Sequence, residues 1–186
     1  MSVSLAQLIA MSGMMAVTHT TRQPATDIYE VLDYLDHKAA APGVDATRVG
    51  LWAVSGHVPV ALSALIRQPQ RSFRAAVFSN GFTLDLEGSA VADAARTYGF
   101  VNACARHSVD DLPPDVPLFI ARSGQDELPG LNDALDHFVS AAVRRNLPIT
   151  FVNHPAAPHC FELNDDSELS RSIIGQMLAF MQFHLT

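Results

Sequence analysis

Three side chains of this sequence have the types needed for nucleophilic catalysis: Ser55, Asp126 and His159. A serine hydroxyl is a weak nucleophile until a base takes its proton, and a histidine serves as that base when a carboxylate orients its imidazole. The three residues follow one another along the chain in the order nucleophile, acid, base. Their types and order point to acyl transfer through a serine nucleophile.

The residues around Ser55 predict a sharp turn from a strand into a helix. Residues 48–54 are mostly apolar, as in a buried parallel strand, and apolar residues at helical spacing follow at Ala61, Leu62, Leu65 and Ile66. A serine at such a junction exposes its hydroxyl above a helix N-terminus, where backbone N–H groups favour an oxyanion. This is the geometry of a nucleophile elbow, and the N–H of Gly56, directly after the serine, is the expected oxyanion donor.

The elements that must position these side chains alternate between short apolar runs and amphipathic helices, which is typical of a parallel α/β sheet. The expected strands are residues 14–18, 48–54, 75–79, 118–121 and 149–152. The expected helices are residues 5–11, 27–37, a helix from the elbow to about 67, part of 83–107, 131–143 and a closing helix around 173–181. Asp126 and His159 follow the last two strands, so both should lie near Ser55 at the carboxyl edge of the sheet.

Composition narrows the class of protein further. At 186 residues, 48% hydrophobic and 17% charged, the chain is predicted to form one globular domain over residues 1–186, with a core that needs no disulfide or metal. A net charge of −7 argues against nucleic acid as a partner. Two irregularly spaced cysteines indicate a reducing compartment, and the N-terminus has neither a signal-peptide pattern nor a membrane span. We therefore expect a cytoplasmic protein.

Taken together, these motifs resemble the α/β-hydrolase superfamily, and in particular its dienelactone hydrolase-like group, from about Leu5 to the C-terminus. Residues 45–52 resemble the entry into the family's elbow, residues 124–126 its acid loop and residues 158–161 its histidine loop. The resemblance implies a doubly wound, mainly parallel sheet flanked by helices, a Ser55–His159–Asp126 triad and no metal or organic cofactor. Dienelactone hydrolase itself uses a cysteine, so a serine points to the esterase-like relatives and to a small carboxylic ester or lactone as substrate.

The sequence also departs from the family pattern. The elbow glycines of the family are replaced by Ala53 and His57, and a further glycine by Cys160. A histidine at position 57 is expected to point outward, which makes it a candidate substrate contact. The family has eight strands, and this sequence corresponds to a start just before the fourth. On that reading, the loop that supplies the second oxyanion donor is absent, a loss that typically costs ~10²–10³ in turnover. The side left uncovered, rich in methionines, is a candidate homo-oligomer interface.

Each functional assignment has a plainer alternative. Ser55 could cap a helix, Asp126 could stabilise a turn, and His159 could be a solvated loop residue. A metal site is not predicted, because the spacings of the nearby histidine, cysteine and aspartate residues match no standard ligand set. For the whole chain, the main alternative is a catalytically inactive, truncated hydrolase-fold protein that acts as a binding or assembly module. A nucleotide- or flavin-binding domain is a weaker alternative, since no glycine-rich phosphate loop is present.

Overall fold

Four apolar runs of the sequence form one parallel sheet in the computed structural model, which describes residues 2–38, 44–71, 73–86 and 90–186. The strands are β1 (Val49–Val54), β2 (Phe73–Ser79), β3 (Leu118–Ser123) and β4 (Ile149–His154), and they lie in sequence order across the sheet. Every neighbouring pair is parallel, so each connection has to cross back over a face of the sheet.

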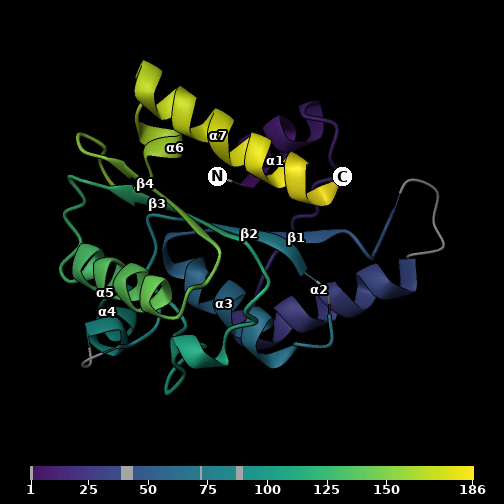
Figure 1. Cartoon of the computed structure of the whole chain (residues 1–186), viewed down its shortest axis with the longest axis horizontal. Coiled ribbons are helices and arrows are strands. Elements are labelled where there is room, and N and C mark those ends of the chain that lie inside the picture. Colours follow the sequence, from purple (N-terminus) through teal and green to yellow (C-terminus); the bar gives the residue numbers. More distant parts are fainter. Residues whose placement is uncertain (1, 39–43, 72, 87–89) are drawn as a thin grey trace.

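Helices cover both faces of this sheet (Figure 1). On one face lie α3 (Val58–Arg67) and α5 (Leu131–Arg144), with α2 (Pro24–Lys38) packed against α3 and α4 (Ala90–Tyr98) against α5. The other face is covered by α7 (Glu168–Leu185), preceded by the short α6 (Phe161–Asn164). The remaining helix is α1 (Ser2–Met11), and 3-10 turns occur at Ser55–His57 and Val109–Asp111. The result is a three-layered α/β fold.

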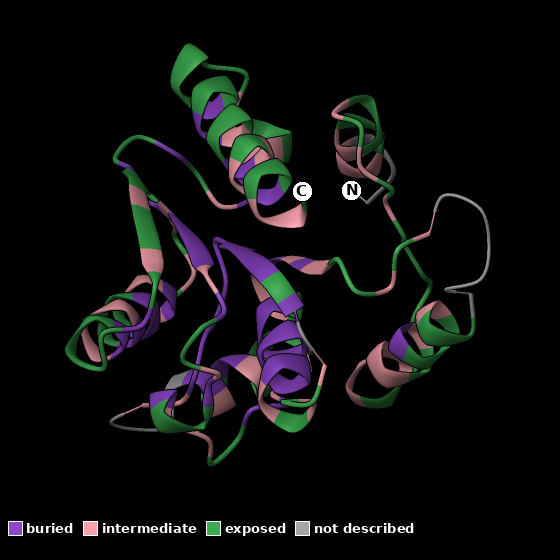
Figure 2. Cartoon of the chain, turned by 45° about the vertical axis from the view of Figure 1, so that its right-hand side comes forward, coloured by how far each residue is buried: buried purple, intermediate pink, exposed green. Residues whose placement is uncertain are grey.

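Helix α3 is the most deeply buried helix among the described residues, because the sheet covers one side of it and α2 another. All eight of its residues from Val58 to Leu65 are buried, and Leu62 and Leu65 have no exposed surface. Figure 2 shows α3 almost entirely in the colour of buried residues, whereas residues 5–11 of α1 are exposed or half-buried. The helix that follows Ser55 is thereby held rigidly in the core.

One strand prediction is wrong. Residues 14–18 were predicted to form a strand, but they make no ladder and the described sheet has four strands instead of about five. The segment still alternates like a strand, with Met14 and Ala16 half-buried and Met15 and Val17 exposed. It has no pairing partner, because an open groove of about 420 Å³ lies beside β1, between this segment, α2 and the end of α7. An alternating pattern predicts extended backbone, but not the neighbouring strand that a ladder requires.

The other predicted strands are confirmed, with ends shifted by one or two residues. The predicted helices are also confirmed, although several extend further than predicted, most of all α7. The partly helical segment 83–107 contains α4, and residues 87–89 of that segment lie outside the described residues. Within the part of the chain that is described, no helix is both long and apolar enough to cross a membrane.

Candidate active site

Ser55 lies at the sharp turn between β1 and α3, as the first residue of the 3-10 turn. Its backbone φ is +56°, in the left-handed region that residues other than glycine rarely adopt. A conformation of this kind costs of the order of 1–3 kcal/mol and persists only where its surroundings impose it. The backbone at Ser55 therefore has the strained geometry of a nucleophile elbow.

Two glycines allow other loops to pack closely against this turn. A Cβ on Gly56 would lie 2.7 Å from Cβ of Phe100, whose ring stacks on Phe82 at a centroid distance of 4.9 Å. A Cβ on Gly81 would lie 2.2 Å from Cγ2 of Val58 and 3.0 Å from the carbonyl oxygen of Ser55. Sequence reasoning missed Gly81, since a glycine directly after a strand is an ordinary turn signal.

Backbone hydrogen bonds join the loop after β3, which carries Asp126, to the loop after β4, which carries His159 (the histidine loop). The N–H of Gly124 donates to the carbonyl of His154 at 2.8 Å, and the N–H of Gln125 donates to that of Ala157 at 2.9 Å. The loops approach so closely that a Cβ on Gly124 would lie 2.5 Å from the carbonyl oxygen of Pro155. The β3–β4 ladder thus continues past the strand ends into the loops that carry Asp126 and His159.

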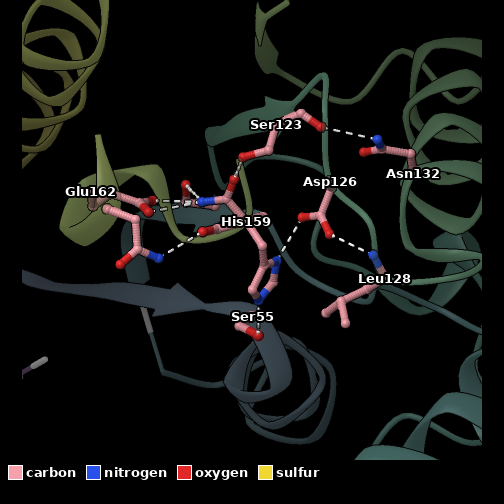
Figure 3. A network of polar contacts seen from close by, with 10 residues as sticks. Ser55, Ser123, Asp126, Leu128, Asn132, His159 and Glu162 are labelled. Atoms are coloured by element: carbon pink, nitrogen blue, oxygen red, sulfur yellow. Dashed lines mark hydrogen bonds and ion pairs between the residues drawn. The ribbon is translucent and has the colours of Figure 1, made fainter. Parts of the chain in front are cut away.

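Ser55 and Asp126 each lie within hydrogen-bonding distance of His159, so the three residues predicted from separate motifs form one connected series (Figure 3). Oγ of Ser55 and Nε2 of His159 share a hydrogen bond of 2.8 Å, in which the hydroxyl donates when the imidazole is neutral, and Nδ1–H of His159 donates to Oδ2 of Asp126 at 2.6 Å. Oδ1 of Asp126 accepts the N–H of Leu128 at 3.0 Å. The Asp126 side chain is fully buried, whereas 27% of the His159 side chain is exposed. The arrangement is a hydrogen-bonded relay from a buried carboxylate to a solvent-accessible serine.

The buried carboxylate changes the titration of the histidine. The hydrogen bond that His159 donates to Asp126 is the main cause that raises the pKa of His159, to about 10, and a hydrogen bond with Cys160 acts in the same direction. Partial burial of the imidazole opposes this rise. Because only the neutral imidazole accepts a proton, the capacity of His159 to act as a base increases as the pH rises toward 10.

The remaining predicted residues lie close to this relay. Gly56 directly follows Ser55 in the 3-10 turn, and His57 ends that turn with an exposed side chain. No group of three histidine, cysteine, aspartate or glutamate side chains among the described residues is placed to hold a metal ion.

Comparisons with known proteins give a fold but no sequence family. No protein-family model matches the chain, and no curated protein sequence matches it either. Among solved structures, it is similar to a carboxylesterase from Lactobacillus plantarum, with a TM-score of 0.72 at 16% identity over 96% of this chain and 78% of the other. A carboxyl esterase from Tuber melanosporum gives a TM-score of 0.76 at 12% identity, covering 100% and 73% of the two chains.

A thermostable esterase from Pseudomonas putida is similar to the same degree, with a TM-score of 0.76 at 13% identity over 98% of this chain and 70% of the other. At these identities the likeness is one of fold. The chain therefore has a parallel sheet flanked by helices, in the arrangement found in esterases of the α/β-hydrolase fold.

Proposed function

We propose that the protein is a serine hydrolase of the esterase type, which cleaves a small carboxylic ester or lactone. The observation that carries this proposal is the hydrogen-bonded relay of Ser55, His159 and Asp126 at a strained elbow. A helix-capping serine or a solvated loop histidine would not need a fully buried aspartate at 2.6 Å from the imidazole. The esterase neighbours support the same class of reaction by analogy of fold.

In the proposed reaction, Oγ of Ser55 attacks the ester carbonyl while Nε2 of His159 takes the hydroxyl proton. The tetrahedral oxyanion accepts a hydrogen bond from the backbone N–H of Gly56. Its collapse expels the alcohol, which takes the proton from His159, and leaves an acyl group on Ser55. Water, deprotonated by His159, then releases the acid and restores the serine. Asp126 holds the imidazole in the tautomer that these reaction steps require, with the proton on Nδ1, and stabilises the imidazolium.

The finer assignments belong to the same proposal. The motifs at residues 45–52, 124–126 and 158–161 favour the dienelactone hydrolase-like group. His57, which is exposed directly after the elbow, is a candidate substrate contact, and His57→Ala should then change KM more than kcat. Cys104 and Cys160 are both unpaired and buried, which supports a cytoplasmic location.

Labelling with a fluorophosphonate probe tests the proposal directly. The folded protein is incubated with the probe at pH 8 to 9.5, and the adduct is located by mass spectrometry. Ser55→Ala should abolish labelling, whereas Ser12→Ala, the same substitution at a serine outside the relay, should not affect it. If circular dichroism shows a folded protein and Ser55 carries no adduct, the hydrolase proposal is refuted.

One observation favours a second candidate, a binding or assembly module without catalysis. The groove of about 420 Å³ beside β1 is lined mainly by apolar side chains, and β1 has a strand on only one side among the described residues. A second copy of the chain is the proposed occupant, since Met14 and Met15 of the methionine-rich N-terminal segment line the same groove. Light scattering after size exclusion tests this occupant, and a monomer over the micromolar range would exclude a second copy. A dimer that completes the sheet leaves catalysis open, so this candidate is favoured over the hydrolase only if Ser55 in the folded protein carries no fluorophosphonate adduct.

A further inference from the structure

A second polar network lies beside His159 and takes no part in the relay described above (Figure 3). Its carboxylate belongs to Glu162, in α6, three residues after His159. Oε1 and Oε2 of Glu162 accept hydrogen bonds from Nδ2 of Asn80 at 2.9 and 2.8 Å. Asn80 directly follows β2, is fully buried and has a left-handed φ of +47°. A strained, buried residue is therefore used to hold a carboxylate next to the proposed base.

The same asparagine ties Glu162 to the ends of two neighbouring strands. Nδ2 of Asn80 also donates to Oγ of Ser79 at 2.7 Å, and its Oδ1 accepts the hydroxyl of Ser123. Ser79 and Ser123 are the last residues of β2 and β3, and both are fully buried. The network thus fixes α6, and with it the histidine loop, to the carboxyl ends of β2 and β3.

The partners of Asn80 also fix which way its amide points. The Ser123 hydroxyl occupies the amide oxygen, so the amide NH₂ faces Glu162, and this suits an acceptor-only carboxylate. The pKa of Glu162 is raised overall, mainly by burial, and hydrogen bonds from Ser79 and Asn80 and the charge of His159 offset part of this rise. The attraction between Glu162 and His159 is mutual, so it also favours the protonated imidazole. The titratable groups that act on the imidazole are then Asp126, Cys160 and Glu162.

We propose that Glu162 is a positioning residue, which locks the His159 loop onto β2 and β3 and supports the imidazolium formed when Ser55 gives up its proton. Asp126 acts on His159 through a direct hydrogen bond and is the main cause of the rise in its pKa, whereas the interaction between Glu162 and His159 is one of charge alone. The kinetic part of this inference rests on the proposed hydrolase function, whereas the effect on His159 does not.

The variant Glu162→Gln keeps the shape of the side chain and removes its charge. A histidine-selective NMR titration should place the midpoint of His159 lower than in the unmodified protein, by about 0.5 to 1 pH unit. His159→Gln identifies the signal among the eight histidines. The pH dependence of fluorophosphonate labelling should shift in the same direction, with a maximal rate about tenfold lower. Glu168→Gln, which removes an exposed carboxylate in the first turn of α7, should change neither.

An unchanged His159 midpoint in folded Glu162→Gln overturns the electrostatic part of the inference, and an unchanged labelling rate overturns the positioning part. If Glu162→Gln does not fold, Glu162→Asp tests the proposal instead, because it keeps the negative charge and shortens the side chain by one methylene. It should keep the midpoint of His159 and lower the maximal labelling rate at least threefold, and an unchanged rate refutes positioning. If the unmodified protein is not labelled at all, the hydrolase proposal fails, and the NMR titration still tests the effect on His159.

Discussion

Replacing Asp126 by asparagine separates the two effects that this carboxylate has on His159, one on the tautomer of the imidazole and one on its pKa. Oδ1 of Asp126 accepts the Leu128 N–H, so an asparagine would keep its oxygen there and turn its NH₂ toward Nδ1 of His159. Nδ1 would then have to accept, and the proton would move to Nε2, the atom that must take the proton of Ser55. In a serine triad this wrong tautomer costs about 10⁴ in rate, or about 5 kcal/mol of transition-state stabilisation.

The second effect, on the pKa of His159, makes the variant faster at neutral pH and so offsets part of the loss in rate. Asp126 is the main cause that raises the pKa of His159 to about 10, so at pH 7 only about one imidazole in 10³ is neutral in the unmodified protein. In Asp126→Asn the pKa falls toward its ordinary value and most molecules carry a neutral imidazole. We therefore expect a net loss of only about tenfold at pH 7 and about 10³-fold at pH 9.

The assay is the rate of fluorophosphonate labelling of Ser55 between pH 7 and 9.5, compared for the two proteins. Glu127→Gln removes one charge from the adjacent, exposed position and should follow the unmodified protein. Thermal melts at each pH show whether Asp126→Asn remains folded. A rate ratio that stays constant across this pH range, or a variant as fast as the unmodified protein, would show that Asp126 does not set the tautomer and the pKa of His159 as described.

Four further perturbations have expected outcomes. The rate of Ser55 modification should rise by about tenfold per pH unit above pH 7, because only neutral His159 accepts the proton, and a plateau below pH 8 would contradict this. Gly124→Ala should lower the free energy of unfolding by about 1–3 kcal/mol in urea titrations, since its Cβ would lie 2.5 Å from a backbone oxygen. Gly175→Ala, an exposed helical glycine with no atom within 4 Å of its Cβ, should instead stabilise by about 0.5–1 kcal/mol. Leu62→Ala, in the fully buried helix behind the elbow, should cost about 2–5 kcal/mol in the same titration, and a loss below 1 kcal/mol would show that the helix is not held as described.

The parts of the site that could be predicted from sequence are those with a local signal. Ser55 lies between a run of strand type and a run of helix type, and Asp126 and His159 each follow a strand of the same sheet. Since the carboxyl ends of parallel strands share one edge, finding the strands was enough to bring the three residues together.

What the sequence could not predict depends on contacts between distant segments. Residues 14–18 have the alternation of a strand, but whether they pair depends on the neighbour beside β1. Asn80 and Glu162 are separated by 82 positions, and neither residue type is unusual in its own segment. The close approach at Gly81 depends on Val58, which comes from another element. Each of these contacts forms between segments that are distant in the sequence, so no pattern within one segment predicts it.

The position of β1 in the sheet has a consequence for how the molecule loses activity. Among the described residues β1 is hydrogen-bonded to β2 alone, and it ends at the proposed nucleophile. β4, which precedes the proposed base, is the other edge strand and pairs with β3 alone. Peeling β1 from the sheet breaks fewer backbone bonds than opening the interior, so it belongs to the low-energy local openings of the native state. In rising urea, catalysis should therefore decline before the far-ultraviolet signal does, and the amides of β1 should exchange with solvent faster than those of β2. A hydrolase of the proposed kind would therefore lose its site at the edge of the sheet while most of its core remains folded.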